Sequence, residues 1–262
     1  MLQEMGVRVW LPDSTVNATE TESLDSTPVK EKMVFNALAT SPAVARPATS
    51  VAAGTLGVLP TGIEAMPWAE LQTTVATCQA CTLCNSRKQA VLGVGSTQAR
   101  WMVVGEAPGE QEDQQGEPFV GSAGQLLDNM LLAMGLNRSG ANANGVYITN
   151  ALKCRPPANR NPQAEEVAQC AAYLRRQVLL LQPQMILALG RFAAQSLLSD
   201  AVPNVASIPL DKLRSQVHHH QGVPVIVSYH PAYLLRRPGE KSKAWADLCL
   251  ALDRMQSKAQ PA

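Results

Sequence analysis

The chain has 262 residues, of which 46% are hydrophobic and 16% charged, and its net charge is +1. This length allows one large domain or a domain with an extension, and the near-zero net charge does not by itself indicate a polyanionic partner. The N-terminal residues lack a basic stretch followed by an apolar run, and no apolar run reaches membrane-spanning length. We therefore expect a soluble, cytoplasmic protein with no membrane partner.

The first 66 residues differ in composition from the rest of the chain. They are rich in Ser, Thr, Ala, Pro and Val and show no sustained helical period. They carry 4 basic and 7 acidic residues, against 18 and 14 in the remainder. We predict a disordered or weakly ordered extension over residues 1–66, with a folded extension as the alternative. Residues 67–262 form one mildly basic domain, which permits nucleic-acid binding.

Beyond residue 66, short apolar runs alternate with amphipathic segments. The periodicity predicts helices over residues 66–78, 122–134, 164–181, 191–198 and 243–256, and strands over residues 101–105, 146–149, 185–189 and 223–228. This alternation predicts an α/β protein, with three α/β/α layers around a central, mostly parallel four-stranded sheet. The loops at the carboxyl ends of the strands are then the expected functional site.

Six cysteines in a cytoplasmic protein favour metal or cluster ligation over disulfides. Three of them lie within seven residues, and the other three follow much later: Cys78, Cys81, Cys84, Cys154, Cys170 and Cys249. A CxxC pair supplies two ligands from one turn, and Cys154 and Cys170 can join them from a loop and the helix that follows. Spacing leaves zinc and an iron–sulfur cluster open, although the long second gap fits zinc poorly, and it does not choose between Cys81 and Cys84.

Four polar segments follow the predicted strands. They are GEAPG at 105–109 continuing to Val120, YITN at 147–150 continuing through ALKCRPP to NRNP, LGR at 189–191, and SYHPAYLLRRP at 228–238. A Gly/Pro loop after a strand can bring backbone N–H groups close to a ligand. The absence of a GxGxxG motif after the first strand argues against a dinucleotide-binding oxidoreductase.

Together these segments strongly resemble the family 4 uracil-DNA glycosylases, the iron–sulfur branch of the uracil-DNA glycosylase superfamily. The matching pieces are GEAPG, EDQQGEPFVGSAGQLL, NALKCRPPANRNP, LALGRFAAQSLL and HPAYLLR, between about Cys78 and Leu252. The resemblance implies an enzyme that hydrolyses the N-glycosidic bond of uracil in DNA and so initiates base excision repair. It also implies action on uracil-containing DNA without an organic cofactor, and we expect a monomer.

The resemblance further implies a four-iron, four-sulfur cluster held by Cys78, Cys81, Cys154 and Cys170. The family pattern CxxCxL is satisfied by residues 78–83, which makes Cys84 an additional cysteine. In this family the cluster braces the loops near the DNA.

The implied chemistry gives roles to individual side chains in the loops. Uracil must rotate out of the duplex into a pocket, where Asn150 can donate to O4 and accept from N3–H, a pattern that cytosine reverses. Phe119 is expected to stack on the base beside Ala107. His230 is expected to stabilise the charge that develops at O2 as the bond breaks, in either its neutral or its protonated form.

The water that attacks the sugar carbon needs a carboxylate to orient it. The resemblance places functional weight on Glu106 and Glu112, which we expect to be catalytic together with His230. The best-known branch of the superfamily has Asp two residues after the loop glycine, where this chain has Ala107. The water-orienting group is therefore either displaced in sequence or dispensable.

The segment after His230 is expected to enter the DNA. Tyr233 or Leu234 would wedge into the space that the flipped base leaves. Phosphate contacts are expected from basic side chains of this loop and of the loop after residue 154, namely Arg236, Arg155 and Arg160. The three consecutive histidines at 218–220 are expected in a surface loop.

Two alternatives remain at the level of the sequence. One is a glycosylase of the same superfamily that acts on another deaminated base. The other is a non-catalytic zinc-stabilised nucleic-acid-binding module, which would keep the cysteines but would not need Asn150, Phe119 and His230 together.

Overall fold

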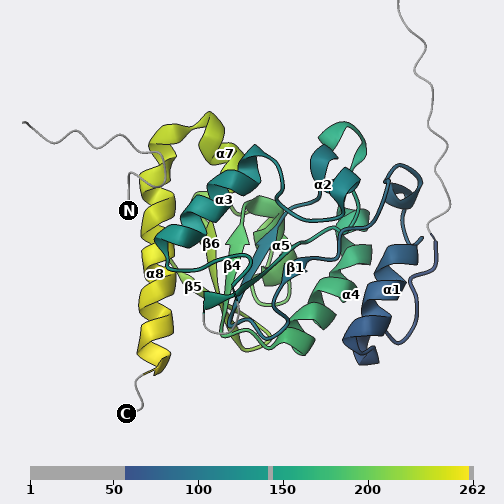
Figure 1. Ribbon diagram of the computed structural model, residues 1–262, viewed down its shortest axis with the longest axis horizontal. Helices are drawn as coiled ribbons and strands as arrows, with labels where there is room; N and C mark the ends of the chain where they lie inside the picture. The colour runs from purple at the N-terminus through teal and green to yellow at the C-terminus, as the bar shows by residue number, and fades with distance from the viewer. Residues whose placement is uncertain (1–56, 141–143, 260–262) are drawn as a thin grey trace, which may run out of the picture. The chain divides into compact units, whose positions relative to one another are not determined.

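The computed structural model describes residues 57–140 and 144–259 (Figure 1). Its helices are α1 Trp68–Thr77, α2 Glu110–Gln115, α3 Ser122–Ala133, α4 Ala164–Leu181, α5 Arg191–Leu198, α6 Leu210–Leu213, α7 Pro231–Arg236 and α8 Lys241–Ala259, and its strands are β1 Val94–Gly95, β2 Trp101–Gly105, β3 Val146–Asn150, β4 Met185–Leu189, β5 Val217–His220 and β6 Val223–Ser228. The five predicted helices and four predicted strands are all present, with ends that shift by at most a few residues. None of the helices in these residues is long and apolar enough to cross a membrane.

The strands form one sheet in the order β1-β3-β2-β4-β6-β5. The four central strands are parallel, while β1 and β5 pair antiparallel at the two edges. The predicted α/β class with a mostly parallel sheet is confirmed, although the sheet has six strands rather than four. The edge strands gave no apolar signal, because β1 is only two residues long and β5 contains the three histidines.

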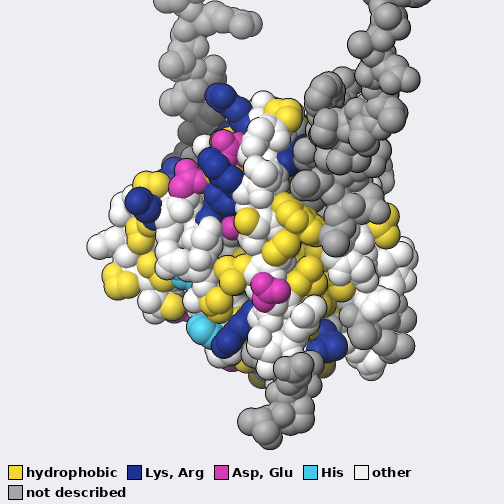
Figure 2. Space-filling view, turned by 90° about the vertical axis from the view of Figure 1, so that its left-hand side faces the viewer, with side chains coloured by type: hydrophobic (Ala, Val, Ile, Leu, Met, Phe, Trp, Pro, Cys, Tyr) yellow, Lys and Arg dark blue, Asp and Glu magenta, His cyan; other side chains and the backbone are white. Residues whose placement is uncertain are grey.

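Helices cover both faces of the sheet, as Figure 1 shows. Alternate strand residues face opposite sides, which divides the core into two clusters. Trp101, Val103 and Ile148 pack toward α3 and α8, and Met102 and Val104 pack toward α4 and α5. On the outer side of α8, hydrophobic side chains lie among charged ones of both signs (Figure 2). The three-layer arrangement holds the carboxyl ends of the parallel strands at one edge.

A third hydrophobic cluster joins the N-terminal part of the domain to α4. Ile63 and Met66 are buried there, with Leu71 and Val75 of α1. The folded domain therefore begins before residue 67, and the predicted boundary is too late for residues 57–66. The rest of the predicted extension, residues 1–56, lies outside the described residues.

Two predicted loops are partly regular. Residues 110–115 form α2, and Pro231 starts α7 with His230 as the N-cap, a position that suits proline because the first helical N–H needs no partner. The surface loop predicted for residues 218–220 is wrong. His220 lies in β5 with 4% of its surface exposed and forms a hydrogen bond to the Leu197 carbonyl, because the strand buries alternate side chains.

Candidate functional site

A cavity of about 690 Å³ opens at the carboxyl ends of the central strands. We call it the base cavity. It is lined by side chains that follow β2, β3, β4 and β6, among them Glu106, Ala107, Glu112, Phe119, Asn150, Arg160, Arg191, Asp211, His230, Tyr233 and Arg236. The two sequence-predicted site residues that do not line it, apart from the cysteines, are Arg155 and Leu234.

Asn150 ends β3 opposite Gly105 of β2 and is almost fully buried. Its side-chain oxygen Oδ1 has no hydrogen-bond partner among the described residues. A Cβ atom at Gly105 would lie 2.3 Å from this oxygen and 2.5 Å from Cζ of Phe119. Only glycine therefore allows the amide and the ring to approach β2 together. A buried amide oxygen without a partner is an acceptor available to a ligand.

Phe119 has a left-handed backbone, with φ at 56°, which is uncommon for a residue that carries a side chain. Its ring lies against Gly105 and stacks on the imidazole of His230, with a centroid distance of 5.4 Å and an interplanar angle of 26°. The structure thus brings Phe119, Asn150 and His230 together in one cavity.

The backbone fixes the form of the imidazole of His230. The N–H of Ala232 donates to Nδ1 at 3.2 Å, so Nδ1 is an acceptor and Nε2 carries the proton of the neutral ring. Desolvation by burial, assisted by the positive charge of Arg236 and opposed by Glu112, lowers the pKa of His230 to about 4. The imidazole is therefore neutral at pH 7, with an N–H available to a ligand.

The two candidate carboxylates have different surroundings. Glu112 accepts from the backbone N–H groups of Gly109 at 3.1 Å, Val120 at 3.1 Å and Gly121 at 3.3 Å, and so joins the loop after β2 to the loop that carries Phe119. Glu106 lines the same cavity, and burial raises its pKa. Since both oxygens of Glu112 already accept backbone hydrogen bonds, Glu106 is the better placed to bind a water molecule.

The two leucines of HPAYLLR lie in α7 and differ in exposure. Leu234 is fully buried in the core cluster beneath α3 and α8, whereas Leu235 is 42% exposed. Of the two predicted wedge residues, Tyr233 and Leu234, Leu234 is not exposed for contact with DNA in this structure, because its side chain points into the protein. Tyr233 and Arg236 line the base cavity, and their predicted contacts with DNA stay predictions.

The two arginines after Cys154 are engaged within the protein. Arg160 donates to both oxygens of the buried Glu166, at 2.9 and 2.5 Å. Burial alone would raise the pKa of the Glu166 carboxyl, but the hydrogen bonds and charge of Arg160 outweigh burial and lower it. Arg155 donates to Asn159 at 2.8 Å and lies 3.6 Å from Glu110. A phosphate that contacts Arg155 or Arg160 in this structure therefore meets a guanidinium that already has partners within the protein.

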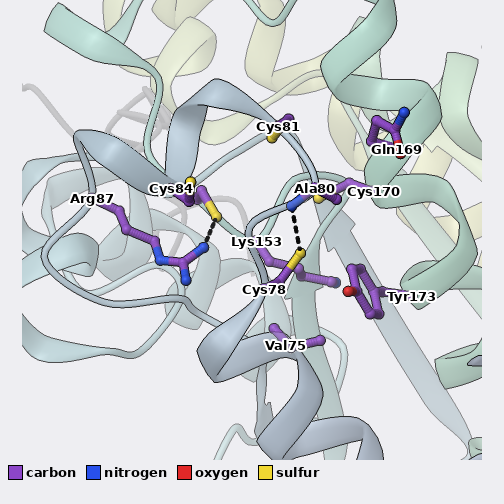
Figure 3. Close-up of a pocket in the computed structure, with 11 residues that line it drawn as sticks. Val75, Cys78, Ala80, Cys81, Cys84, Arg87, Lys153, Gln169, Cys170 and Tyr173 are labelled. Atoms are coloured by element: carbon purple, nitrogen blue, oxygen red, sulfur yellow. Dashed lines mark hydrogen bonds between the residues drawn. The ribbon is translucent and has the colours of Figure 1, made fainter. Parts of the chain in front are cut away.

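A second pocket lies beside α1 and α4 and is lined by five cysteines: Cys78, Cys81, Cys84, Cys154 and Cys170 (Figure 3). We call it the cysteine pocket. Cys81, Cys154 and Cys170 are buried, and the N–H of Ala80 lies 3.5 Å from the sulfur of Cys78. Loop residues 78–84, the loop after β3 and the start of α4 therefore converge on one point, as the predicted ligation requires.

Two cations that the sequence did not single out border the cysteine pocket. Arg87 donates to the sulfur of Cys154 at 2.9 Å. Lys153 is buried, and its ammonium donates to Thr149 Oγ1 at 2.7 Å, the Asn150 carbonyl at 2.7 Å and Gln177 Oε1 at 2.6 Å. Burial lowers the pKa of Lys153 to about 7, opposed by the charges of Cys170 and Cys154. Lys153 stands between Leu152 and Cys154, but lysine is rarely buried, so no signal in the sequence indicated that its ammonium would be.

Comparison with known proteins agrees with this site. The family model of the uracil DNA glycosylase superfamily matches residues 92–249. The chain is 44% identical over 168 residues to the type-4 uracil-DNA glycosylase of Archaeoglobus fulgidus, covering 63% of this chain and 81% of that protein. It is 39% identical to the enzyme of the same type from Pyrobaculum aerophilum, over 69% of this chain and 91% of that protein.

Residues 92–249 contain all of the base cavity and the part of the cysteine pocket that includes Lys153, Cys154 and Cys170. A third relative, the type-4 uracil-DNA glycosylase of Thermotoga maritima, is 41% identical over 62% of this chain and 80% of its own length. The chain belongs to the uracil-DNA glycosylase superfamily, and within it to the type-4 uracil-DNA glycosylases.

Proposed function

We propose that the base cavity holds a uracil that has rotated out of DNA and that the residues brought together there hydrolyse its N-glycosidic bond. The observation that carries the proposal is the unpaired Oδ1 of Asn150, buried beside Phe119 and His230. A cavity of about 690 Å³ holds a pyrimidine together with part of its deoxyribose and phosphates.

Asn150 supplies the selectivity for uracil in this proposal. Its Oδ1 accepts from uracil N3–H, and its amide nitrogen donates to O4. Cytosine has an acceptor at N3 and a donor at C4, so both contacts would fail and leave buried groups unpaired, at about 1–3 kcal/mol each. The ring of Phe119 supplies the face on which the base stacks, and it fits against β2 because Gly105 has no side chain.

His230 stabilises the leaving group. As the bond between N1 and the sugar breaks, negative charge builds on uracil O2 and the sugar becomes positively charged. The Ala232 N–H occupies Nδ1, so the neutral ring directs Nε2–H into the cavity. A fixed donor at the developing charge lowers the barrier without first having to reorganise.

Glu106 orients the attacking water. It lies at the cavity wall after β2, and no side chain or backbone N–H of residues 57–140 and 144–259 donates to its carboxylate, whereas Glu112 accepts from three backbone N–H groups. We assign Glu112 to holding the two loops in register. Arg236, an exposed residue of α7 that lines the cavity, is the group proposed to meet phosphate, and the exposed Leu235 beside it in the chain is proposed to fill the gap in the base stack.

The cysteine pocket fits a four-iron, four-sulfur cluster held by Cys78, Cys81, Cys154 and Cys170. The four thiols come from three segments and line one pocket, which is the ligand set that a cluster of this kind requires. The N–H groups of Ala80 and Arg87 lie at the sulfurs of Cys78 and Cys154, as suits anionic thiolates. When bound, the cluster supplies cross-links among three segments rather than a chemical step.

The experiment that tests the proposal is single-turnover release of uracil from a uracil-containing oligonucleotide by the full chain and its Asn150→Ala variant. Loss of two hydrogen bonds to the reacting base predicts a rate reduced by roughly 100-fold or more. Asn159→Ala, which removes an amide from the rim of the same cavity, is a less damaging control. Equal rates for Asn150→Ala and the unaltered chain would remove the amide from the reaction.

A further inference from the structure

Arg138 lies outside the base cavity, yet it holds the backbone of the residue proposed to stack on the base. It follows α3 in the connection to β3, and its guanidinium donates through Nη1 to the Pro118 carbonyl at 3.0 Å and through Nη2 to the Phe119 carbonyl at 2.8 Å. Its third donor, Nε, reaches Asp128 Oδ1 of α3 at 2.8 Å. One planar group thus ties the Phe119 loop to the helix.

Phe119 needs such a restraint because of its conformation. A left-handed backbone at a residue with a side chain persists only where its surroundings fix it. The Phe119 carbonyl also lies directly against α3, where a Cβ atom at Gly124 would come within 1.8 Å of it. The first-turn N–H groups of Gly124 and Gln125 bond to the Gly121 carbonyl instead. The guanidinium is therefore the donor that meets this turned carbonyl.

The position of the ring depends on that carbonyl. Since the backbone at Phe119 sets where its side chain points, rotation out of the left-handed region would move the ring away from Gly105 and from its stacked contact with His230. Arginine suits this task, because its rigid fork serves two adjacent acceptors at once while a lysine ammonium cannot reproduce the planar geometry.

We propose that Arg138 is a positioning residue for uracil binding, which presets the stacking face of Phe119 through the Pro118 and Phe119 carbonyls without contacting the DNA. The inference rests on the proposed stacking role of Phe119. It also gives Arg138 a function that a lysine or an aliphatic side chain of similar length would not fulfil.

The test compares binding of two oligonucleotides that differ at a single nucleotide, which carries a uracil in one and no base in the other. One carries 2′-fluoro-2′-deoxyuridine, which resists hydrolysis, and the other carries a tetrahydrofuran abasic site. For Arg138→Met and Arg138→Lys we expect the Kd for the fluorouridine strand to rise about tenfold, the scale of one lost base–aromatic contact, with the abasic strand changing by about twofold or less. Arg138→Lys keeps the charge and carries the test if Arg138→Met fails to fold.

Two controls separate positioning from general stability. Asp128→Asn leaves both carbonyl bonds in place and alters only a half-exposed ion pair. The ratio of its Kd for the fluorouridine strand to its Kd for the abasic strand should therefore stay within about threefold of the ratio for the unaltered chain. Leu198→Ala opens a cavity on the opposite face of the sheet and lowers the thermal midpoint without touching the loop. An unchanged ratio in both controls, with a raised ratio in the Arg138 variants, supports the inference.

Three outcomes would overturn it. The ratio could remain unchanged in both Arg138 variants, or rise equally in Leu198→Ala. The third concerns Phe119→Leu: if that variant leaves the ratio unchanged, then stacking by Phe119 fails and the inference falls with it. If Phe119→Leu raises the ratio while the Arg138 variants do not, only the inference fails and the proposed function stands.

Discussion

The base cavity and the cysteine pocket are both built on residues 150–154, but the buried amide of the first and the two cations beside the second differ in their partners. In the base cavity the buried Asn150 Oδ1 is left without a partner among the described residues. Beside the cysteine pocket, the three hydrogens of the Lys153 ammonium meet three oxygens, and Arg87 meets a sulfur. The hydroxyl of Tyr173, which also lines the cysteine pocket, has no partner among the described residues, so the contrast concerns Asn150 and the two cations. An unpaired amide suits a ligand that enters and leaves, whereas fully paired cations suit a permanent structural element.

Substitution of Glu106 tests the base-cavity side of this comparison with the largest expected effect. If unpaired polar groups in the cavity act on the substrate, the free carboxylate of Glu106 should be essential to the reaction. Glu106→Gln should slow uracil release by about 100-fold or more, the usual scale for loss of a general base. Glu117→Gln removes an exposed carboxylate nearby and should leave the rate unchanged. A wild-type rate in Glu106→Gln would return the role to Glu112 or to no carboxylate.

The pH dependence gives the same assignment a second measurement. Burial raises the pKa of Glu106, and only the ionised form accepts from water, so the rate should fall with decreasing pH at a higher pH than for an exposed glutamate. His230, whose pKa is lowered to about 4, stays neutral over that range and adds no step near its ordinary value of 6.5. Single-turnover rates between about pH 5 and pH 8 should show the acid limb in the unaltered chain and not in Glu106→Gln.

Lys153→Met tests the saturated side of the comparison. Methionine fills similar space but donates nothing, so the acceptors at Asn150 and Gln177 lose a buried partner, at about 1–3 kcal/mol each. We expect the free energy of unfolding to drop by about 3 kcal/mol, and bound iron per chain to fall because Lys153 adjoins Cys154. Denaturant titration and iron analysis measure these. Lys212→Met, on the exposed surface of α6, should change neither.

The sequence predicted the central sheet and the long helices because their signal is local. The apolar runs of β2, β4 and β6 and the period of α4 appear in consecutive residues, and the structure keeps them. Asn150 and His230 were expected near one another because each stands at or after the end of a strand at the same edge, whereas Phe119, which lies beyond α2, was expected there from the family resemblance. The failures depend on long-range packing: nothing local reveals that His220 is buried, that Lys153 meets Gln177, or that Arg138 reaches back to Phe119.

The adjacent leucines of α7, Leu234 and Leu235, are a second case in which the sequence did not reveal burial. They also give the smallest expected effect on activity. Six residues are too few to reveal a helical period, so the sequence could not tell which leucine faces outward. Leu234→Ala should lower the free energy of unfolding by about 2–5 kcal/mol, as for other buried leucines. Leu235→Ala should leave stability within about 0.5 kcal/mol of the unaltered chain.

The effects of the two substitutions on activity should be reversed. If the exposed leucine fills the gap left by the flipped base, Leu235→Ala should slow uracil release from duplex DNA by roughly threefold to tenfold and have less effect on single strands, where no stack must be opened. Leu234→Ala, measured where it remains folded, should slow both substrates equally. A duplex-specific defect in Leu234→Ala instead would mean that α7 rotates on meeting DNA, because its buried face would then have to reach the base stack.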